Sequence, residues 1–222
     1  MYFEIRNCHK NIGRAGFPQS VNIKLDEGKS VNDPDFIWNL STSSFPDFTP
    51  TIGTIVVRDG AKLTDFISSA TISSGFIISQ RVKSILENFR LATSKFYKCS
   101  LLHKDILIEG YYYLHTLNKL VFEIDFERSS FNIMSSNVVE ETQKFNNFDE
   151  LQSRSDEINR TNGKYKLQFD RLYVSKFNAE ESDLFETGIA GYGTFISGSL
   201  KKALEENNIT GINYREAKIS CS

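Results

Sequence analysis

The stretch FIISQRVKSILENF, residues 76–89, joins a short strand to a helix, and the rest of the chain is best interpreted from it. Its first three residues are apolar and β-prone. Ser79 stands where a helix N-cap is expected, because its hydroxyl can accept a hydrogen bond from an unpaired N–H of the first turn. The apolar residues that follow have the i, i+3, i+4, i+7 spacing of one buried helix face: Val82, Ile85, Leu86 and Phe89. The stretch therefore predicts a strand that ends at Ser79 and a helix over residues 80–89.

A second stretch, TFISGSLKKALEEN at residues 194–207, has the same organisation 118 positions later. Identical pairs at this offset include Ser79/Ser197, Lys83/Lys201, Leu86/Leu204 and Glu87/Glu205. Each stretch is followed by another β-prone segment, Phe96–Cys99 and Ile212–Tyr214. An amphipathic helix after a strand could look alike by chance, but the matching order favours a structural repeat. We therefore expect two related lobes, each ending in strand–helix–strand.

Several other segments are β-prone, and one of them alternates strictly between apolar and polar residues. They are residues 2–6, 23–25, 36–38, 54–57, 108–115, 120–126, 131–134 and 165–174. In the alternating segment, Leu120–Phe126, one face is apolar and the other carries Val121, Glu123 and Asp125, which is typical of a half-solvated antiparallel strand. Residues 146–163 are polar and are expected to be looped or partly helical. The pattern predicts an α+β fold with mixed, largely antiparallel sheets and a few helices.

The domain organisation follows from the absence of a Pro/Gly/Ser-rich linker. The chain of 222 residues is long enough for one large domain or two small ones. We expect one compact unit over residues 1–222, with possible lobes at 1–103 and 104–222.

The charge balance is close to neutral but unevenly distributed. The 26 Lys+Arg and 28 Asp+Glu give a net charge of -2, which excludes a wholly basic nucleic-acid binder. Residues 1–122 carry a net +3 and residues 123–222 a net -5. The acids that we take as candidate partner-binding residues are Glu140, Glu141, Asp149, Glu150, Asp156, Glu157, Glu180, Glu181 and Asp183. They form either a solvated face or a docking surface for a basic protein partner.

The compartment is predicted from the N-terminus and the cysteines. Residues 1–7 lack the basic start and apolar core of a signal peptide, and no apolar run approaches the ~18 residues of a membrane span. Cys8, Cys99 and Cys221 are an odd count without a CxxC pair and are most simply free thiols of a reducing compartment. We expect a cytoplasmic protein with no membrane partner.

No residue pattern is strong enough to assign catalytic, cofactor-binding or metal-binding residues. His115 lies on a β-prone segment without a nucleophile in a signature context. The pairs Cys8-His9 and Cys99-x3-His103 are lone, whereas structural zinc sites combine two such pairs. The glycine-rich stretch Gly188–Gly193 precedes a strand and lacks the GK[ST] ending of a phosphate-binding loop. We expect ordinary structural roles for these residues, and no cofactor.

The second half resembles the immunity proteins of bacterial polymorphic-toxin systems. The resemblance runs over about residues 64–216 and does not include the first 60. The segments that carry it are Tyr112–Leu114 with Asn118, Asp125 with Ser129 or Ser130, Leu172–Ser175, Phe195–Ser197, Leu200–Glu206 and Thr210–Tyr214.

This resemblance implies a protein without enzymatic activity that binds and neutralises a cognate toxin, usually encoded beside it. Two alternatives come from other classes. One is a small-molecule or nucleotide-binding enzyme that uses His115 or the loop near Gly191, and the other is a structural or adaptor subunit. The identity of the toxin and the oligomeric state do not follow from the sequence.

Overall fold

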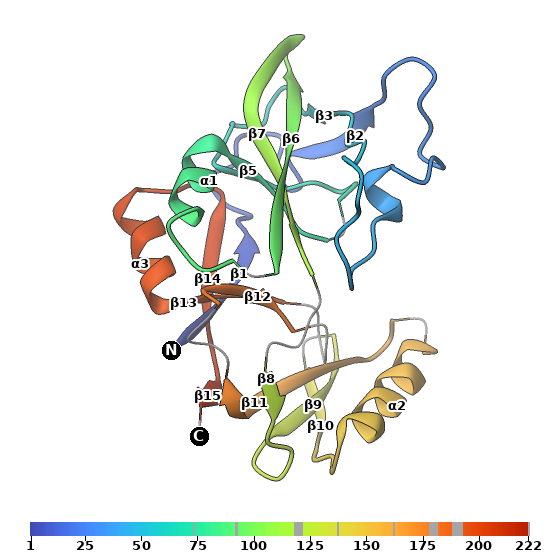
Figure 1. The fold of residues 1–222 in the computed structure, drawn as a ribbon, viewed down its shortest axis with the longest axis vertical. Coiled ribbons are helices and arrows are strands. Elements are labelled where there is room, and N and C mark those ends of the chain that lie inside the picture. The colour runs from blue at the N-terminus through green and yellow to red at the C-terminus, as the bar shows by residue number, and fades with distance from the viewer. Residues whose placement is uncertain are drawn as a thin grey trace.

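The computed structural model shows an α+β fold with three α-helices and three sheets in the part of the chain that it describes (Figure 1). Most strand pairs are antiparallel, and β3–β6 and β11–β15 are parallel. The described residues are 1–72, 74–91, 93–117, 122–136, 138–161, 163–177, 182–187 and 193–221. The predicted fold class, with mixed and largely antiparallel sheets, is confirmed at this level.

The largest sheet has six strands and uses the first half of the chain. Its spatial order is β2 (Ser20–Lys24), β3 (Thr54–Val57), β6 (Ser94–His103), β7 (Ile106–Thr116), β5 (Phe76–Ser79) and β4 (Phe66–Ile67). The β6–β7 hairpin projects from one end of the molecule (Figure 1).

The two smaller sheets contain the remaining strands. The four-stranded sheet has the order β12 (Leu184–Glu186), β13 (Thr194–Ser197), β1 (Tyr2–Asn7) and β14 (Ile212–Ala217). The five-stranded sheet has the order β10 (Val138–Gln143), β9 (Ser130–Ser135), β11 (Lys166–Phe177) and β15 (Ile219–Cys221), with β8 (Phe122–Ile124) also paired to β11. Because β1 lies between β13 and β14, the N-terminal strand completes a sheet that is otherwise made from the C-terminal end.

Two hairpin–helix units have the same element order. The first unit is β4, β5 and α1 (Gln80–Leu86), and the second is β12, β13 and α3 (Gly198–Glu206). Ser79 and Ser197 cap the two helices as predicted, since their side chains accept from the Val82 and Leu200 amides. Helix α1 ends at Leu86, three residues before the predicted end at Phe89.

Each unit is tied together by a buried aspartate that precedes its hairpin. Asp65 Oδ1 accepts from the Ser79 hydroxyl at 2.8 Å, and Asp183 Oδ1 accepts from the Ser197 hydroxyl at 2.7 Å. Asp65 and Asp183 are only 6% and 5% exposed. Both lie 14 residues before the capping serine, so they correspond at the same offset of 118.

The two aspartates also link the units to each other. Asp65 Oδ2 accepts from the amide and hydroxyl of Thr210, which follows α3, at 3.0 and 2.8 Å. Asp183 Oδ2 accepts from the amide and side chain of Arg90, which follows α1, at 3.1 and 3.2 Å. Each aspartate is therefore hydrogen-bonded to the segment that follows the helix of the other unit. Gly211 is needed beside this link, because its φ is +86° and a Cβ there would lie 2.1 Å from the Phe66 carbonyl oxygen.

The strand that flanks each hairpin comes from a different part of the chain. In the first unit β7 places Tyr111 opposite Ser79, and in the second β1 places Tyr2 opposite Ser197. The helix lysines lie over matching aromatic rings as a result. Lys83 lies over the Phe96 and Tyr112 rings, and Lys201 lies over Phe3 and Tyr214. Such cation–π contacts contribute about 0.5–1 kcal/mol each at exposed positions.

The helices share one apolar core, and the five-stranded sheet has another. Val82 and Leu86 of α1 pack in the same cluster as Leu200 and Leu204 of α3. Helix α2 (Phe148–Asn159) instead buries Leu151 and Ile158 against β9 and β11, through the residues Phe131, Ile133 and Leu167. The predicted partly helical segment at 146–163 is therefore an amphipathic helix with its own core.

Two predicted strands differ from the structure. Residues 36–38 are not a strand, because Ile37–Asn39 form a short 3₁₀ helix. The Asn39 amide donates to the Phe36 carbonyl at 2.8 Å, so local turn bonds override the β-propensity of the apolar side chains. The predicted strand 120–126 is observed only over Phe122–Ile124, with residues 120 and 121 outside the described part.

Replacing Asp183 with Asn tests the importance of the buried carboxylates. The change weakens charge-assisted hydrogen bonds to Ser197 and Arg90, so we expect a loss of unfolding free energy on the order of 1–3 kcal/mol at pH 7. Urea unfolding measures it. Asp47→Asn, at an exposed position, is the matched control and should stay within about 0.5 kcal/mol.

The difference in stability between wild type and Asp183→Asn should shrink at low pH. Burial alone would raise the pKa of the Asp183 carboxyl, but the hydrogen bond from Ser197 and the contacts with Arg90 lower it below its usual 3.8. A lowered folded-state pKa gives stability that is present above the unfolded pKa and disappears as the pH falls through the folded pKa. The gap between wild type and Asp183→Asn should therefore narrow below about pH 4. A gap of constant size down to pH 2 would contradict the electrostatic origin of the effect.

Candidate functional site

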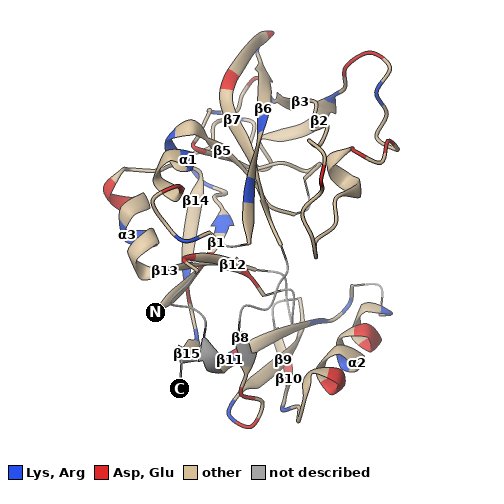
Figure 2. Ribbon diagram, viewed as in Figure 1, with Lys and Arg blue, Asp and Glu red and all other residues tan. Residues whose placement is uncertain are grey.

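The predicted acidic residues of the second half gather on α2 and on strand β10. Helix α2 begins after Asn147, whose side chain accepts from the Glu150 amide, and its first turn contains Asp149 and Glu150, where negative charge is favourable. Asp156 and Glu157 lie near its other end, and Arg154 is the single basic residue in the helix. Figure 2 shows acidic residues along α2, which lies at the edge of the molecule.

Strand β10, at the edge of its sheet, contains two more of the predicted acids. Glu140 and Glu141 are exposed, as are all its residues except Gln143. A groove of about 390 Å³ runs between β10 and α2, and both glutamates line it together with Glu157 and Tyr165. Arg154 donates to Glu157 at 2.5 Å, so that carboxylate is partly neutralised. The structure thus brings Glu140, Glu141 and Glu157 to one groove, although the two elements are separate in sequence.

The remaining predicted acids have other positions. Asp183 is buried and bonded to Ser197 and Arg90, so it supports the fold and is not available at the surface. Glu180 and Glu181 lie outside the described residues. Glu150, in the first turn of α2, has a capping role as well. Its carboxylate accepts from the Asn146 amide at 3.0 Å, and this hydrogen bond lowers the pKa of the carboxyl.

The two residues His115 and Cys99, considered above for catalysis or metal binding, are both buried. His115 is 1% exposed, its ring is stacked on Tyr113, and its Nε2 lies 3.1 Å from the Ser41 carbonyl oxygen. Burial lowers the pKa of His115, which keeps the imidazole neutral. Burial also raises the pKa of the Cys99 thiol to about 12, so it is not a nucleophile at neutral pH.

The structure gives no support to the metal and nucleotide sites considered from the sequence, in the part of the chain that it describes. Among the described residues, no group of three or more His, Cys, Asp or Glu side chains is placed to hold a metal ion. In the glycine-rich stretch, residues 188–192 lie outside the described part and Gly193 precedes β13.

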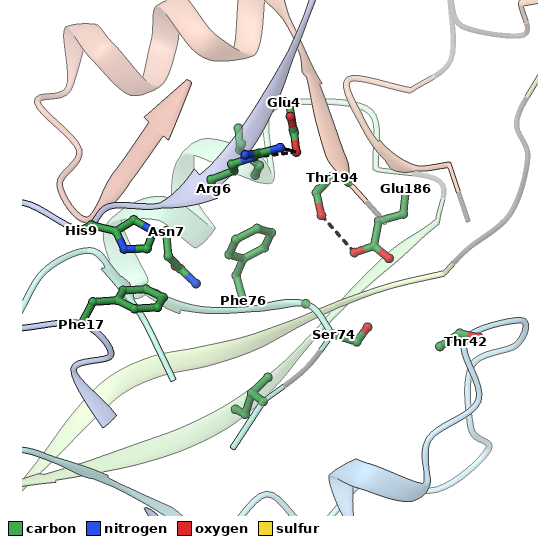
Figure 3. Close-up of a pocket in the computed structure, with 14 residues that line it drawn as sticks. Glu4, Arg6, Asn7, His9, Phe17, Thr42, Ser74, Phe76, Glu186 and Thr194 are labelled. Carbon is green, nitrogen blue, oxygen red and sulfur yellow. Dashed lines mark hydrogen bonds and ion pairs between the residues drawn. The ribbon is translucent and has the colours of Figure 1, made fainter. Parts of the chain in front are cut away.

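A larger pocket, of about 700 Å³, lies where the two hairpin–helix units meet (Figure 3). The first unit contributes the start of β5 at Gly75 and Phe76, and the second contributes Glu186 and Thr194. The end of β1 and the segments around Phe17 and Thr42 complete the lining, with Glu4, Arg6, Asn7, His9, Ile72 and Ser74 among its residues.

Glu186 is the unusual residue of this pocket. It is 8% exposed, and its Oε1 accepts from the Thr194 hydroxyl at 3.0 Å. Burial raises the pKa of its carboxyl to about 7 despite that hydrogen bond. The neighbouring Glu4 differs, because Arg6 and Arg215 lie 2.7 and 2.5 Å from its two carboxylate oxygens.

The sequence pattern did not predict Glu186 as a site residue. A signal was present, because the offset of 118 aligns Glu186 with the neutral Ser68. Ser68 directly follows β4, whose residues Phe66 and Ile67 pair with Ile78 and Ile77, whereas Glu186 is the last residue of β12 and lies opposite Thr194. The two hairpin–helix units therefore differ in charge at this position.

The described residues thus present an exposed acidic groove between β10 and α2 and a lined pocket between the hairpin–helix units. The chain matches the Immunity protein family (Imm11) over residues 6–219 and belongs to that family. It is therefore an immunity protein that neutralises a cognate toxin, and it is not an enzyme.

The family match is longer than the resemblance over residues 64–216 suggested. It starts at residue 6, so most of the first 60 residues belong to the family domain as well. No curated protein matches the chain in sequence. None of the helices in the described part is long and apolar enough to cross a membrane.

The pKa of Glu186 predicts an unusual pH dependence of stability. A carboxyl with a raised folded-state pKa binds its proton more tightly in the folded state, so stability falls as the pH rises from the usual 4.5 to about 7 and is then level. Glu186→Gln mimics the protonated form. We expect it to exceed wild type above pH 7 by on the order of 3 kcal/mol and to match it near pH 4.

Unfolding by urea across pH 4–8 measures this difference. The control is Glu27→Gln, at an exposed position, which should follow the wild-type pH curve. Parallel curves for wild type and Glu186→Gln would mean that the carboxyl titrates normally.

Proposed function

We propose that this immunity protein blocks a basic toxin by one-to-one binding, and that the toxin docks on the acidic surface of α2 and β10. The observation that carries the proposal is the convergence of Glu140, Glu141 and Glu157 on one groove, flanked by the acids of α2. The other residues of this docking surface are Asp149, Glu150 and Asp156.

Two features of the surface favour a protein partner over a face that is only solvated. First, Val138 and Val139 on β10 are 61% and 48% exposed, and Phe148 at the start of α2 is 40% exposed. Apolar side chains next to charged ones provide contact area as well as steering. Second, β10 is an edge strand, so its outward N–H and C=O groups can accept a further strand.

We also propose a cytoplasmic location and a single compact unit with two related lobes, within residues 1–103 and 104–222. The free thiols of Cys8 and Cys99 fit a reducing compartment. The corresponding bonds of Asp65 and Asp183 support relatedness, and the shared core of α1 and α3 supports one unit.

The docking surface is tested by reversing three exposed acids, Glu140, Glu141 and Asp156, to Lys. If the toxin is basic and docks here, affinity should fall by on the order of 10- to 100-fold, mainly through slower association, and its salt dependence should decrease. Surface plasmon resonance at two ionic strengths, with the cognate toxin domain immobilised, measures both effects.

The matched control reverses Asp26, Glu27 and Asp47, which are exposed in the first half and give the same change of net charge. If both triple variants bind equally well, the toxin docks elsewhere, while the immunity function itself is unaffected by that result.

A further inference from the structure

The pocket between the hairpin–helix units contains a buried carboxyl group for which no cationic partner is found among the described residues. Glu186 receives one hydrogen bond, from Thr194. Arg6 also lines the pocket, but its Nε and Nη2 are both bonded to Glu4 Oε1 at 2.7 Å. A carboxylate buried without a cation is costly and is stabilised when a cation enters its site.

The fold itself does not require this carboxyl. At the matching position of the first unit, Ser68 makes its bonds with Gln19 of the same chain, whose Oε1 accepts from the Ser68 amide at 3.0 Å and from its hydroxyl at 3.1 Å. That neutral pair is complete within the molecule. In the second unit a carboxyl group takes the place of the hydroxyl. It accepts one hydrogen bond, from the Thr194 hydroxyl, and lines a pocket.

The pocket has the size and lining that a long basic side chain needs. Its volume of about 700 Å³ exceeds that of one side chain and leaves room for the backbone that carries it. Phe17, Ile72 and Phe76 provide apolar wall for an aliphatic stem, and Glu186 lies among the polar groups (Figure 3).

We propose that this pocket receives a Lys or Arg side chain of the toxin, whose charged head pairs with the Glu186 carboxylate. The proposal rests on the immunity function and specifies a second contact, separate from the α2–β10 docking surface. It also specifies a feature of the toxin, which is a projecting segment whose basic side chain enters the pocket.

This contact couples binding to pH. The groups that face Glu186 are Thr194 from β13, Glu4 and Arg6 from β1, and Tyr113 from β7. Tyr113 stays neutral because burial, and then the Glu186 charge, raise its pKa. Glu4 is paired with both Arg6 and Arg215, and His9 lines the pocket beside Phe17. The Glu186 carboxyl changes charge near neutrality, with a pKa of about 7.

The cation binds the ionised form, so complex formation releases a proton from Glu186. Only about a tenth of the carboxyl groups are ionised at pH 6, and most are ionised at pH 8. The affinity of wild type for the cognate toxin domain should therefore rise about 10-fold between these pH values. Isothermal titration calorimetry in two buffers of different ionisation enthalpy detects the released proton.

The test compares wild type with Glu186→Gln, which keeps an acceptor for Thr194 and abolishes the charge. We expect the variant to bind more weakly than wild type at pH 8, by a factor that is about 10-fold smaller at pH 6, and with little pH dependence of its own. Glu27→Gln is the control for charge removal. Circular dichroism and urea unfolding establish that each variant is folded.

A second measurement needs no toxin. Butylguanidinium chloride is a cationic probe of the arginine side chain, and butylurea is its neutral isostere. At pH 8 the cation should shift the amide NMR signals of Gly75, Gly193 and Thr194 in wild type but not in Glu186→Gln, and butylurea should shift them much less.

The outcomes separate the pocket from the immunity function. Equal toxin affinities of wild type and Glu186→Gln at both pH values, or equal shifts from butylguanidinium and butylurea, would overturn the pocket proposal while toxin binding persists. If wild type binds no toxin at all, it is the function that fails, and the NMR titration still decides whether the pocket accepts a cation.

Discussion

The fold depends on two buried aspartates, each of which links three segments of the chain: its own, the start of the helix in its unit, and the segment after the helix of the other unit. Asp65 and Asp183 bond the serine that caps their own helix and the chain that leaves the helix of the other unit. A carboxylate can do this because it accepts several hydrogen bonds at once, and charge-assisted bonds are stronger than neutral ones. The two helices are thereby fixed next to each other, and their apolar faces form one core.

The functional groups follow from this arrangement. The reciprocal link brings the starts of β5 and β13 together, and the pocket with Glu186 lies at that junction. The five-stranded sheet adds a separate core, on which α2 packs through Leu151 and Ile158 while its acidic side faces outward. The two contacts that we propose for a toxin differ in kind: an exposed acidic groove to speed encounter, and an enclosed carboxyl to select a basic side chain.

Local features could be predicted from the sequence. Ser79 and Ser197, the helices that follow them and the strand Thr54–Val57 were recognised from spacing and capping chemistry, because they depend on neighbouring residues. The aspartates that bond those serines were missed, since a contact over 14 residues has no periodic signature. Asp183 lies in a run of acids and gave no sign that it is buried. The position of β1 between β13 and β14 joins the two ends of the chain, which short-range patterns do not encode.

The central claim is that this protein neutralises a toxin by forming a complex with it. Mixing the purified chain with its cognate toxin domain, and following mass by light scattering during size-exclusion chromatography, tests this directly when toxin activity is measured on the same fractions. The account predicts a one-to-one complex in which toxin activity is lost. Toxin activity that persists in such a complex, or that disappears without any complex, would contradict it.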